Sequence, residues 1–198
     1  ELPEVAAPQV PSPWKDINTM TIAFGHGIAV SPLQLATGIA GIVNDGVIRP
    51  ATLIKRPDSA APTPGERVIS PRTSEMVREL MRVVVVKGTA TKANVPGYFV
   101  GGKTGTAEKN AKGRYRKDMR VSSFIGTFPV TSPRFVIYFM LDEPKATKAT
   151  FGFATAGWVA VPSAGRLVSQ IAALYGLPPI DPATVEFRDQ GLINVALR

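Results

Sequence analysis

The most specific chemistry in this chain is carried by four consecutive residues, Lys103, Thr104, Gly105 and Thr106, which follow a pair of glycines. Side chains of a β-strand alternate between its faces, so Thr104 and Thr106 point to the same face of a strand while Gly105 offers only backbone. Two hydroxyls on one face can bind a carboxylate, and the lysine adds a charge that attracts an anion or lowers a neighbouring pKa. The pattern predicts a site for an acidic ligand.

Gly105 adds a second property to this strand. A residue without Cβ lets another chain lie close to the strand, and sheet edges bind peptides by adding them as a further strand. The sequence therefore favours a site at the edge of a sheet. The alternative is an ordinary strand that happens to begin with lysine.

Three strands are expected around this segment, over residues 99–107, 121–128 and 134–141. The first two are joined by a basic loop, 108–120, and the last two by the short connection 129–133. Connections of this kind are typical of an antiparallel meander.

Helices are expected on either side of these strands. Ser31 followed by proline, with Gln34 three positions later, is the pattern of a capping box and predicts a helix from residue 32. A second helix, from 71 to Gly88, starts with the same serine–proline signal. The remaining expected elements are a strand over 47–55, which contains a proline that fits a strand poorly, a turn over 153–162 and a terminal helix over 163–175.

Composition and length fit one folded unit. The chain has 198 residues, of which 44% are hydrophobic and 19% charged, values typical of globular proteins. The fold class that we expect is α/β of the α+β type, an antiparallel sheet flanked by helices. Residues 1–16 are interpreted as a proline-rich connector, residues 17–176 as the folded portion and residues 177–198 as a C-terminal tail.

Several kinds of site are excluded by residue counts. The chain has no cysteine and one histidine, His26, which excludes disulfides, thiol nucleophiles and metal sites built on cysteine or several histidines. No metal and no cofactor are expected. His26 lies between two glycines and is interpreted as part of a tight backbone passage rather than as a general base. No apolar run is long enough to span a bilayer, so we expect this chain to be soluble.

Positive charge is concentrated around the proposed site. The net charge is +8, and residues 87–120 alone hold nine lysines and arginines against two acidic residues. Such a region attracts anions. Loop 108–120 is open to three interpretations: a solvated loop, a surface facing a partner or a glycan, and a nucleic-acid contact that uses Tyr115 for stacking.

These residues resemble a known family. Lys-Thr-Gly is the third sequence motif of penicillin-binding proteins, and the resemblance extends to the segments 25–36, 44–50, 88–90 and 101–108. Together they are similar to the C-terminal half of a class B penicillin-binding transpeptidase, from about residue 14 to about residue 176, and closer to the septum-specific enzyme than to the elongation enzyme.

The resemblance implies a penicillin-binding, serine β-lactamase-like fold and a serine D,D-transpeptidase that cross-links peptidoglycan during cell division. It assigns Lys103 a position beside the reactive serine, where the lysine supports proton transfer. Thr104 and Thr106 bind the carboxylate of the substrate or of a β-lactam, next to Gly105. The backbone N–H of Thr106 supplies one oxyanion-hole donor.

Two further motifs of the family are missing from this chain. No S-x-N occurs, and the single S-x-x-K, Ser12 to Lys15, lies in the proline-rich connector, where it is interpreted as a chance match. We therefore expect the nucleophilic serine, its lysine and the S-x-N motif to lie upstream of Glu1. The chain alone is expected to be inactive.

The resemblance also implies partners and a location. The expected partners are the D-Ala-D-Ala stem peptide, β-lactam antibiotics, the upstream part of the same polypeptide and division-machinery membrane proteins, with no nucleic acid. The expected location is the periplasmic face of the bacterial inner membrane, with the full-length protein anchored there. The alternatives are a non-catalytic β-lactam sensor or regulator, a D,D-carboxypeptidase or β-lactamase, and a basic nucleic-acid-binding module. The acceptor, an amine or water, is left open.

Overall fold

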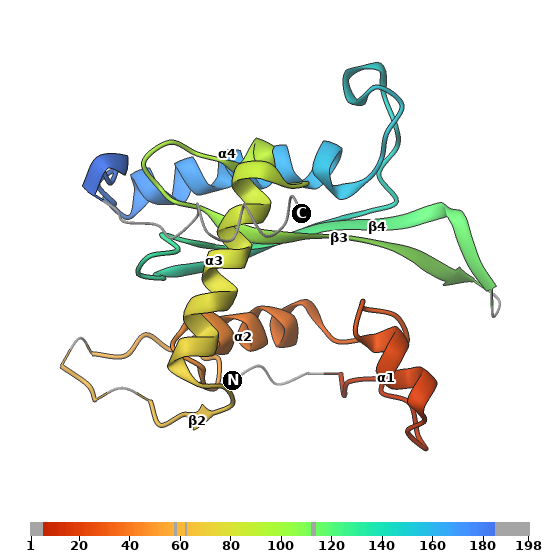
Figure 1. Cartoon of the computed structure of the whole chain (residues 1–198), viewed down its shortest axis with the longest axis horizontal. Helices are drawn as coiled ribbons and strands as arrows, with labels where there is room; N and C mark the ends of the chain where they lie inside the picture. The colour runs from red at the N-terminus through yellow and green to blue at the C-terminus, as the bar shows by residue number, and fades with distance from the viewer. Residues whose placement is uncertain (1–5, 58, 62, 112–113, 185–198) are drawn as a thin grey trace, which may run out of the picture.

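The centre of the protein is a three-stranded antiparallel sheet. The computed structural model describes residues 6–57, 59–61, 63–111 and 114–184. Its main sheet has the order β3–β4–β5 and consists of β3 (Gly101–Ala111), β4 (Arg114–Phe128) and β5 (Phe135–Asp142) (Figure 1). The predicted meander is confirmed, with β3 at one edge of the sheet.

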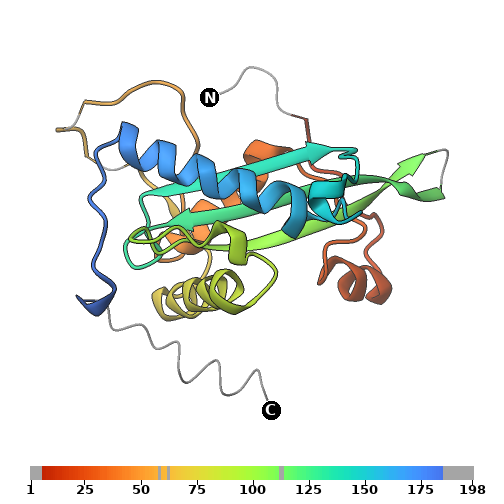
Figure 2. The ribbon, with the colours of Figure 1, turned by 90° about the horizontal axis from the view of Figure 1, so that it is seen from above.

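Helices cover both faces of this sheet. Helix α4 (Ala156–Leu174) runs along one face, α2 (Pro32–Val43) lies on the opposite side, and α3 (Pro71–Lys87) passes beside β3 (Figures 1 and 2). The predicted antiparallel sheet flanked by helices is therefore confirmed. The smaller elements are α1 (Asp16–Ile22), the two-stranded sheet of β1 (Val47–Ile48) and β2 (Glu66–Arg67), and the 3-10 helices η1 (Thr91–Ala93), η2 (Lys148–Thr150) and η3 (Pro182–Thr184).

The two predicted serine–proline helix starts are both present. The Ser31 hydroxyl accepts a hydrogen bond from the Gln34 backbone N–H at 3.2 Å, and the Gln34 side chain accepts one from the Ser31 N–H at 2.8 Å. Ser70 caps α3 in the same way, through the Thr73 N–H at 3.1 Å. Each cap satisfies an N–H of the first turn that has no partner inside the helix.

The core lies between the sheet and α4. Phe124 and Phe128 of β4 are fully buried against the small side chains of α4. The Phe124 ring lies over Gly102 and Gly126: a Cβ built on Gly126 would come within 2.6 Å of the ring, and one built on Gly102 would overlap it. These glycines leave the space that the ring fills.

Two predicted elements in this framework are wrong in extent. The strand expected over 47–55 pairs only over Val47–Ile48, because Pro50 has no N–H to donate to a ladder. The turn expected over 153–162 is wrong from Ala156 onward, because α4 already begins there and contains Pro162. The side chains of Ala156, Ala160 and Ala164 are buried against the sheet, and this packing outweighs the cost of proline in the helix.

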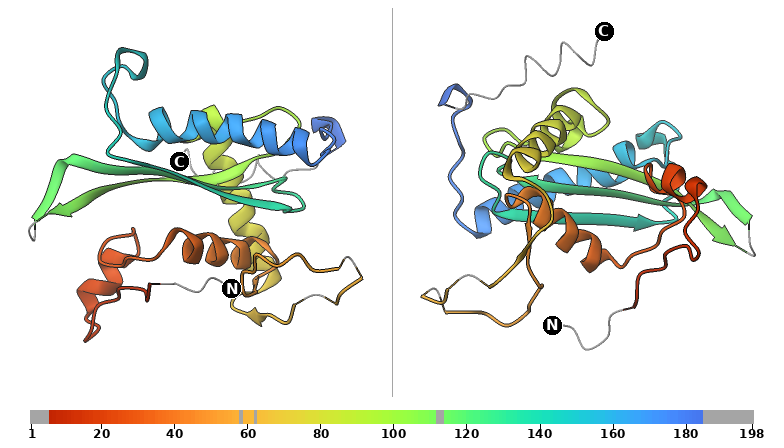
Figure 3. Two further views of the ribbon diagram at one scale, coloured as in Figure 1. Left: turned by 180° about the vertical axis from the view of Figure 1, so that it is seen from behind. Right: turned by 60° about the horizontal axis from the view of Figure 1, so that its bottom comes forward.

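The prediction that residues 108–120 form a loop is also wrong. Strands β3 and β4 continue through most of it as a paired hairpin, with a register shift between Glu108 and Lys109 (Figure 3). The Lys109 ammonium is held by Glu143 at 2.9 Å and by Asp142 at 3.0 Å. The hydrogen bonds to Glu143 and Asp142 raise the pKa of Lys109 above its ordinary value. Residues 112–113 lie outside the described residues.

The terminal segments are attached at a few points. Gln9 and Ala29 form an isolated antiparallel bridge, and the Ile180 N–H donates to the Gly97 carbonyl at 2.8 Å. The predicted boundaries of connector, folded portion and tail remain predictions, and residues 1–5 and 185–198 lie outside the described part. Within the described residues, no helix is long and apolar enough to cross a membrane.

The glycine–phenylalanine packing gives a test of the fold. We predict that Gly102→Ala destabilises the protein by about 1–3 kcal/mol, because the added methyl overlaps the buried Phe124 ring and the carbonyl of Ile125. Equilibrium urea unfolding measures this change. The control is Gly38→Ala in α2, where no atom would lie within 4 Å of the new Cβ and where alanine favours the helix by up to about 1 kcal/mol. Equal stabilities of the two variants would contradict the packing argument.

Candidate active site

The Lys103–Thr106 segment lies on an edge strand. Within the described residues, β3 pairs with β4 along one side and with no strand along the other. Helix α3 approaches β3 at Gly101, where a Cβ would lie 3.2 Å from the backbone nitrogen of Arg82. Beyond that point, Lys103 and Thr106 are exposed. The sheet margin at residues 103–106 is therefore accessible to a ligand.

The two threonines share one face of the sheet, as predicted. Their cross-strand partners are Phe124 and Ser122, and this face is the one covered by α4. The Thr106 hydroxyl accepts a hydrogen bond from the backbone N–H of Ala156 at 3.1 Å. The Thr104 hydroxyl is hydrogen-bonded to the hydroxyl of Thr89 at 2.7 Å. Both hydroxyls are thus fixed by hydrogen bonds to groups outside β3.

These hydroxyls line a cavity of about 340 Å³, which we call the threonine cavity. It lies between β3, the segment that follows α3 and the start of α4. Its lining is rich in hydroxyl groups and consists of Gly88, Thr89, Thr91, Lys92, Thr104, Thr106, Thr155, Ala156, Gly157 and Trp158. Backbone N–H groups at the start of α4 and the Lys92 ammonium make this wall electropositive. The cavity is suited to an anionic group of modest size.

Lys103 and Gly105 point to the face of the sheet away from α4. The Lys103 ammonium donates a hydrogen bond to the Thr104 carbonyl at 2.7 Å. A Cβ on Gly105 would lie 2.8 Å from the Ser123 hydroxyl, and no other atom would lie within 4 Å of it. The side chains of the predicted site therefore approach the margin from two faces, lysine from one and both hydroxyls from the other.

Eight of the ten residues that line this cavity were given no binding role by the sequence, and three of them make notable contacts. Thr89 contacts Thr104 directly, although only its place in the 88–90 motif pointed to it. The Lys92 ammonium lies 3.6 Å from the centre of the Trp158 ring, and that ring stacks on Phe153 at 5.5 Å. Trp158 thus packs on aromatic neighbours and also lines the cavity.

The other sequence candidates lie elsewhere. Ser12 is exposed and precedes α1, and Lys15 is the N-cap of that helix, so the pair does not form a serine at a helix start with lysine one turn later. His26 packs against the Phe24 ring at 5.4 Å, between Gly25 and Gly27, which both have positive φ. Neither Ser12 nor His26 lines the threonine cavity.

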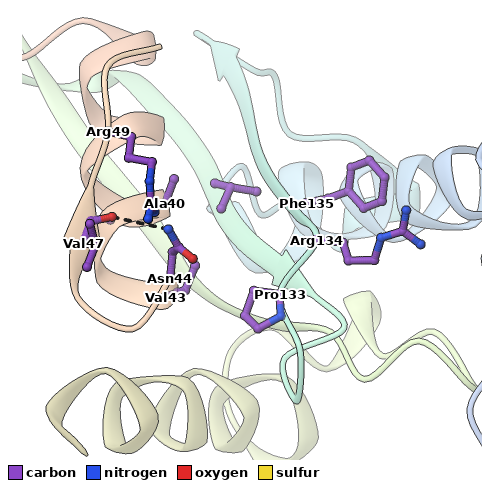
Figure 4. Close-up of a pocket in the computed structure, with 10 residues that line it drawn as sticks. Ala40, Val43, Asn44, Val47, Arg49, Pro133, Arg134 and Phe135 are labelled. Carbon is purple, nitrogen blue, oxygen red and sulfur yellow. Dashed lines mark hydrogen bonds between the residues drawn. The ribbon is translucent and has the colours of Figure 1, made fainter. Parts of the chain in front are cut away.

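A second cavity lies on the α2 side of the protein. It has a volume of about 240 Å³ and is bounded by the end of α2, by β1 and by the start of β5 (Figure 4). Asn44 closes the turn beside it by donating to the Val47 carbonyl at 3.4 Å. No residue of the 103–106 segment lines this cavity, so the candidate active site is the first one.

Comparison with known proteins identifies relatives across most of the chain. Residues 1–160 match the family described as penicillin binding protein transpeptidase domain. The chain is 44% identical to the probable peptidoglycan D,D-transpeptidase FtsI of Caulobacter vibrioides, over 89% of this chain and 31% of the relative. It is 33% identical to the peptidoglycan D,D-transpeptidase FtsI of Escherichia coli, over 91% of this chain and 29% of the relative. The chain thus spans about a third of these relatives.

Solved structures agree with the sequence match. The transpeptidase domain of penicillin-binding protein 3 from Burkholderia pseudomallei superimposes with a TM-score of 0.76 at 37% identity, covering 86% of this chain and 50% of that domain. Penicillin-binding protein 3 from Mycobacterium tuberculosis, solved with ampicillin, gives 0.76 at 31% identity, covering 89% of this chain and 42% of that one. With both the sequence match and the fold in agreement, the chain belongs to the penicillin-binding protein transpeptidase domain family.

Proposed function

We propose that this chain forms part of a serine D,D-transpeptidase that cross-links peptidoglycan stem peptides through an acyl-enzyme. The observation that carries this proposal is the margin of β3, where Lys103 and two threonine hydroxyls converge on an accessible edge. That arrangement can hold the terminal carboxylate of an extended peptide laid against the strand. The names of the relatives, peptidoglycan D,D-transpeptidases, support the same reaction class.

Each residue of the margin has a distinct role in this proposal. Thr104 and Thr106 donate hydrogen bonds to the ligand carboxylate, and their hydroxyls already line one cavity. Lys103 stabilises negative charge near the attacking serine and supports its deprotonation. The Thr106 backbone N–H donates to the oxyanion that forms when the serine attacks the D-Ala-D-Ala carbonyl. The same groups would bind a β-lactam, since its carboxylate corresponds to the carboxylate of the peptide and its ring carbonyl to the carbonyl that the serine attacks.

The nucleophile is proposed to come from polypeptide outside these 198 residues. The sequence contains no S-x-N, and its single S-x-x-K lies in an exposed segment before α1. The relatives are about three times as long as the matched region, which leaves room for the missing motifs. The serine and its lysine would then approach the β3 margin from the upstream part of the same protein.

Two related functions use the same margin. A β-lactam sensor would be acylated without turning over substrate, and a carboxypeptidase or β-lactamase would pass the acyl group to water. Release of D-Ala and formation of cross-linked dimers, measured together with acylation by a fluorescent penicillin, separate the three. Acylation without D-Ala release and without hydrolysis of the penicillin favours the sensor. D-Ala release without cross-linking favours the carboxypeptidase, and hydrolysis of the penicillin favours the β-lactamase.

The proposed location is the periplasmic side of the bacterial inner membrane, with the complete protein anchored there beside membrane proteins of the division machinery. The FtsI names of the relatives support a role in division. A nucleic-acid partner is not proposed, because most of the basic segment that suggested it is paired β-hairpin.

The role of Lys103 can be tested directly. We predict that Lys103→Ala in the complete protein lowers the second-order rate constant of acylation by about 10²–10³-fold, the scale for removing one preorganised electrostatic group. Stopped-flow or gel-based labelling with fluorescent penicillin measures it. The matched control is Lys55→Ala, an exposed lysine outside both cavities, which should leave the rate unchanged. An unaltered rate in Lys103→Ala would remove this lysine from the mechanism.

A second prediction concerns Ser12. The complete protein carrying Ser12→Ala should be acylated by penicillin at the normal rate, because Ser12 lies outside the threonine cavity and is not at a helix start. Mass spectrometry of the acylated wild-type protein should place the adduct on a peptide outside the 198 residues. An adduct on Ser12 would overturn the proposed origin of the nucleophile.

A further inference from the structure

Among the described residues, Thr89 is the side chain whose own hydroxyl contacts a proposed ligand-binding hydroxyl. It lies in the segment between α3 and η1, and its Oγ1 is 2.7 Å from the Oγ1 of Thr104. A separation of this size is that of a well-formed O–H···O hydrogen bond. Both residues line the threonine cavity. The contact joins two segments that are fifteen residues apart in the sequence.

The backbone around Thr89 is fixed by close packing against α4. A Cβ on Gly157 would lie 2.7 Å from the Thr89 carbonyl oxygen, so the helix can approach this carbonyl only because residue 157 is glycine. The next residue, Ala90, is fully buried, and its N–H donates to the Val84 carbonyl at 3.2 Å. The position of the Thr89 hydroxyl relative to β3 is therefore set by the core of the protein.

The direction of the hydrogen bond between Thr89 and Thr104 decides what Thr104 can offer to a ligand. Without a ligand, either hydroxyl can be the donor. A carboxylate only accepts hydrogen bonds, so Thr104 must turn its own O–H toward it. Its oxygen is then left to accept from Thr89, and a hydroxyl that accepts a hydrogen bond becomes a better donor.

Thr106 has the same kind of support from a backbone group. Its oxygen accepts from the Ala156 N–H at 3.1 Å, which leaves its O–H hydrogen for a ligand. The two threonines of β3 thus become donors by two separate means, a main-chain N–H for Thr106 and a side-chain hydroxyl for Thr104. Of the two supporting groups, the hydroxyl can be removed by a side-chain substitution that leaves the backbone unchanged.

We propose that Thr89 is a positioning residue that makes Thr104 a hydrogen-bond donor and so sets the preference of the site for ligands with a free carboxylate. This inference rests on the proposed function, in which Thr104 binds the carboxylate of a stem peptide or β-lactam. Thr89 itself need not touch the ligand. Its effect should be confined to ligands that present an anionic acceptor to Thr104.

The test compares two ligands in the complete protein, benzylpenicillin and its carboxyl methyl ester. In Thr89→Val, which keeps the shape and removes the hydroxyl, the acylation rate constant for benzylpenicillin should fall by about 5–20-fold, the scale of one hydrogen bond to a charged group. The rate constant for the ester should stay within about twofold of wild type, since the ester lacks the charge. Thr89→Ser, which restores the hydroxyl, should recover the preference.

A double substitution separates action through Thr104 from independent action. If Thr89 acts through Thr104, the protein with both Thr89→Val and Thr104→Val should be acylated no more slowly than Thr104→Val alone. The control is Thr131→Val. Thr131 is an exposed threonine at the β4–β5 turn, outside the threonine cavity, and its substitution should leave the acylation rate constants for both ligands unchanged.

Three results would overturn the inference: an unchanged preference for the free carboxylate in Thr89→Val, an equal loss for both ligands, or additive losses in the double variant. An equal loss would mean that Thr89 only maintains structure. All three are read against a wild-type protein that is acylated. Wild-type protein that is not acylated by benzylpenicillin would instead refute the proposed function.

Discussion

The alternation of side chains along β3 is the constraint on which the site depends. Thr104 and Thr106 face α4, while Lys103 and Gly105 face away from it. A slip of one residue against β4 would exchange these faces and turn the lysine toward the helix. Phe124 opposes such a slip, because its ring fits only where Gly102 and Gly126 leave room for it. The packing that fixes the register therefore also fixes which side chains reach the margin.

Helix α4 serves the core and the site at the same time. Its small side chains pack on the sheet, and glycines at 157 and 165 let the carbonyls of Thr89 and Lys92 approach within 2.8 Å of where a Cβ would be. Its first N–H, at Ala156, is bound by the Thr106 hydroxyl instead of by a local cap. The Thr106 hydroxyl, which we propose binds the ligand carboxylate, is thus also the cap of the main core helix. Changes at Thr106 would affect stability and binding together, which makes Thr89 the cleaner position for separating the two.

The parts of the fold that the sequence predicted are those with local signals. The starts of α2 and α3 follow from serine–proline caps at the first residues of each helix, and the meander follows from the connections between consecutive strands. The start of α4 was missed because its cap, Thr106, lies fifty residues earlier in the chain. Pro162 suggested a break that tertiary packing overrides. Of the site, the shared face of Thr104 and Thr106 could be predicted, whereas the contact of Thr89 with Thr104 could not, because it exists only after α3 and β3 have packed together.

An edge strand is the position where these groups can act on one ligand. In a central strand both margins are hydrogen-bonded to neighbours, so a lysine on one face and hydroxyls on the other could not meet at a common group. At the margin of β3 they can, since a ligand lying along the strand is reached from both faces. The Lys103 ammonium has three N–H donors and uses one on the Thr104 carbonyl, which leaves donors for the serine of the proposed function. The Thr106 oxygen accepts from the Ala156 N–H, which leaves its hydrogen for an acceptor, and the Thr104 hydroxyl can do the same when it accepts from Thr89. In the proposed function, the strand thus separates proton transfer by Lys103 on one face from carboxylate binding by the two threonines on the other.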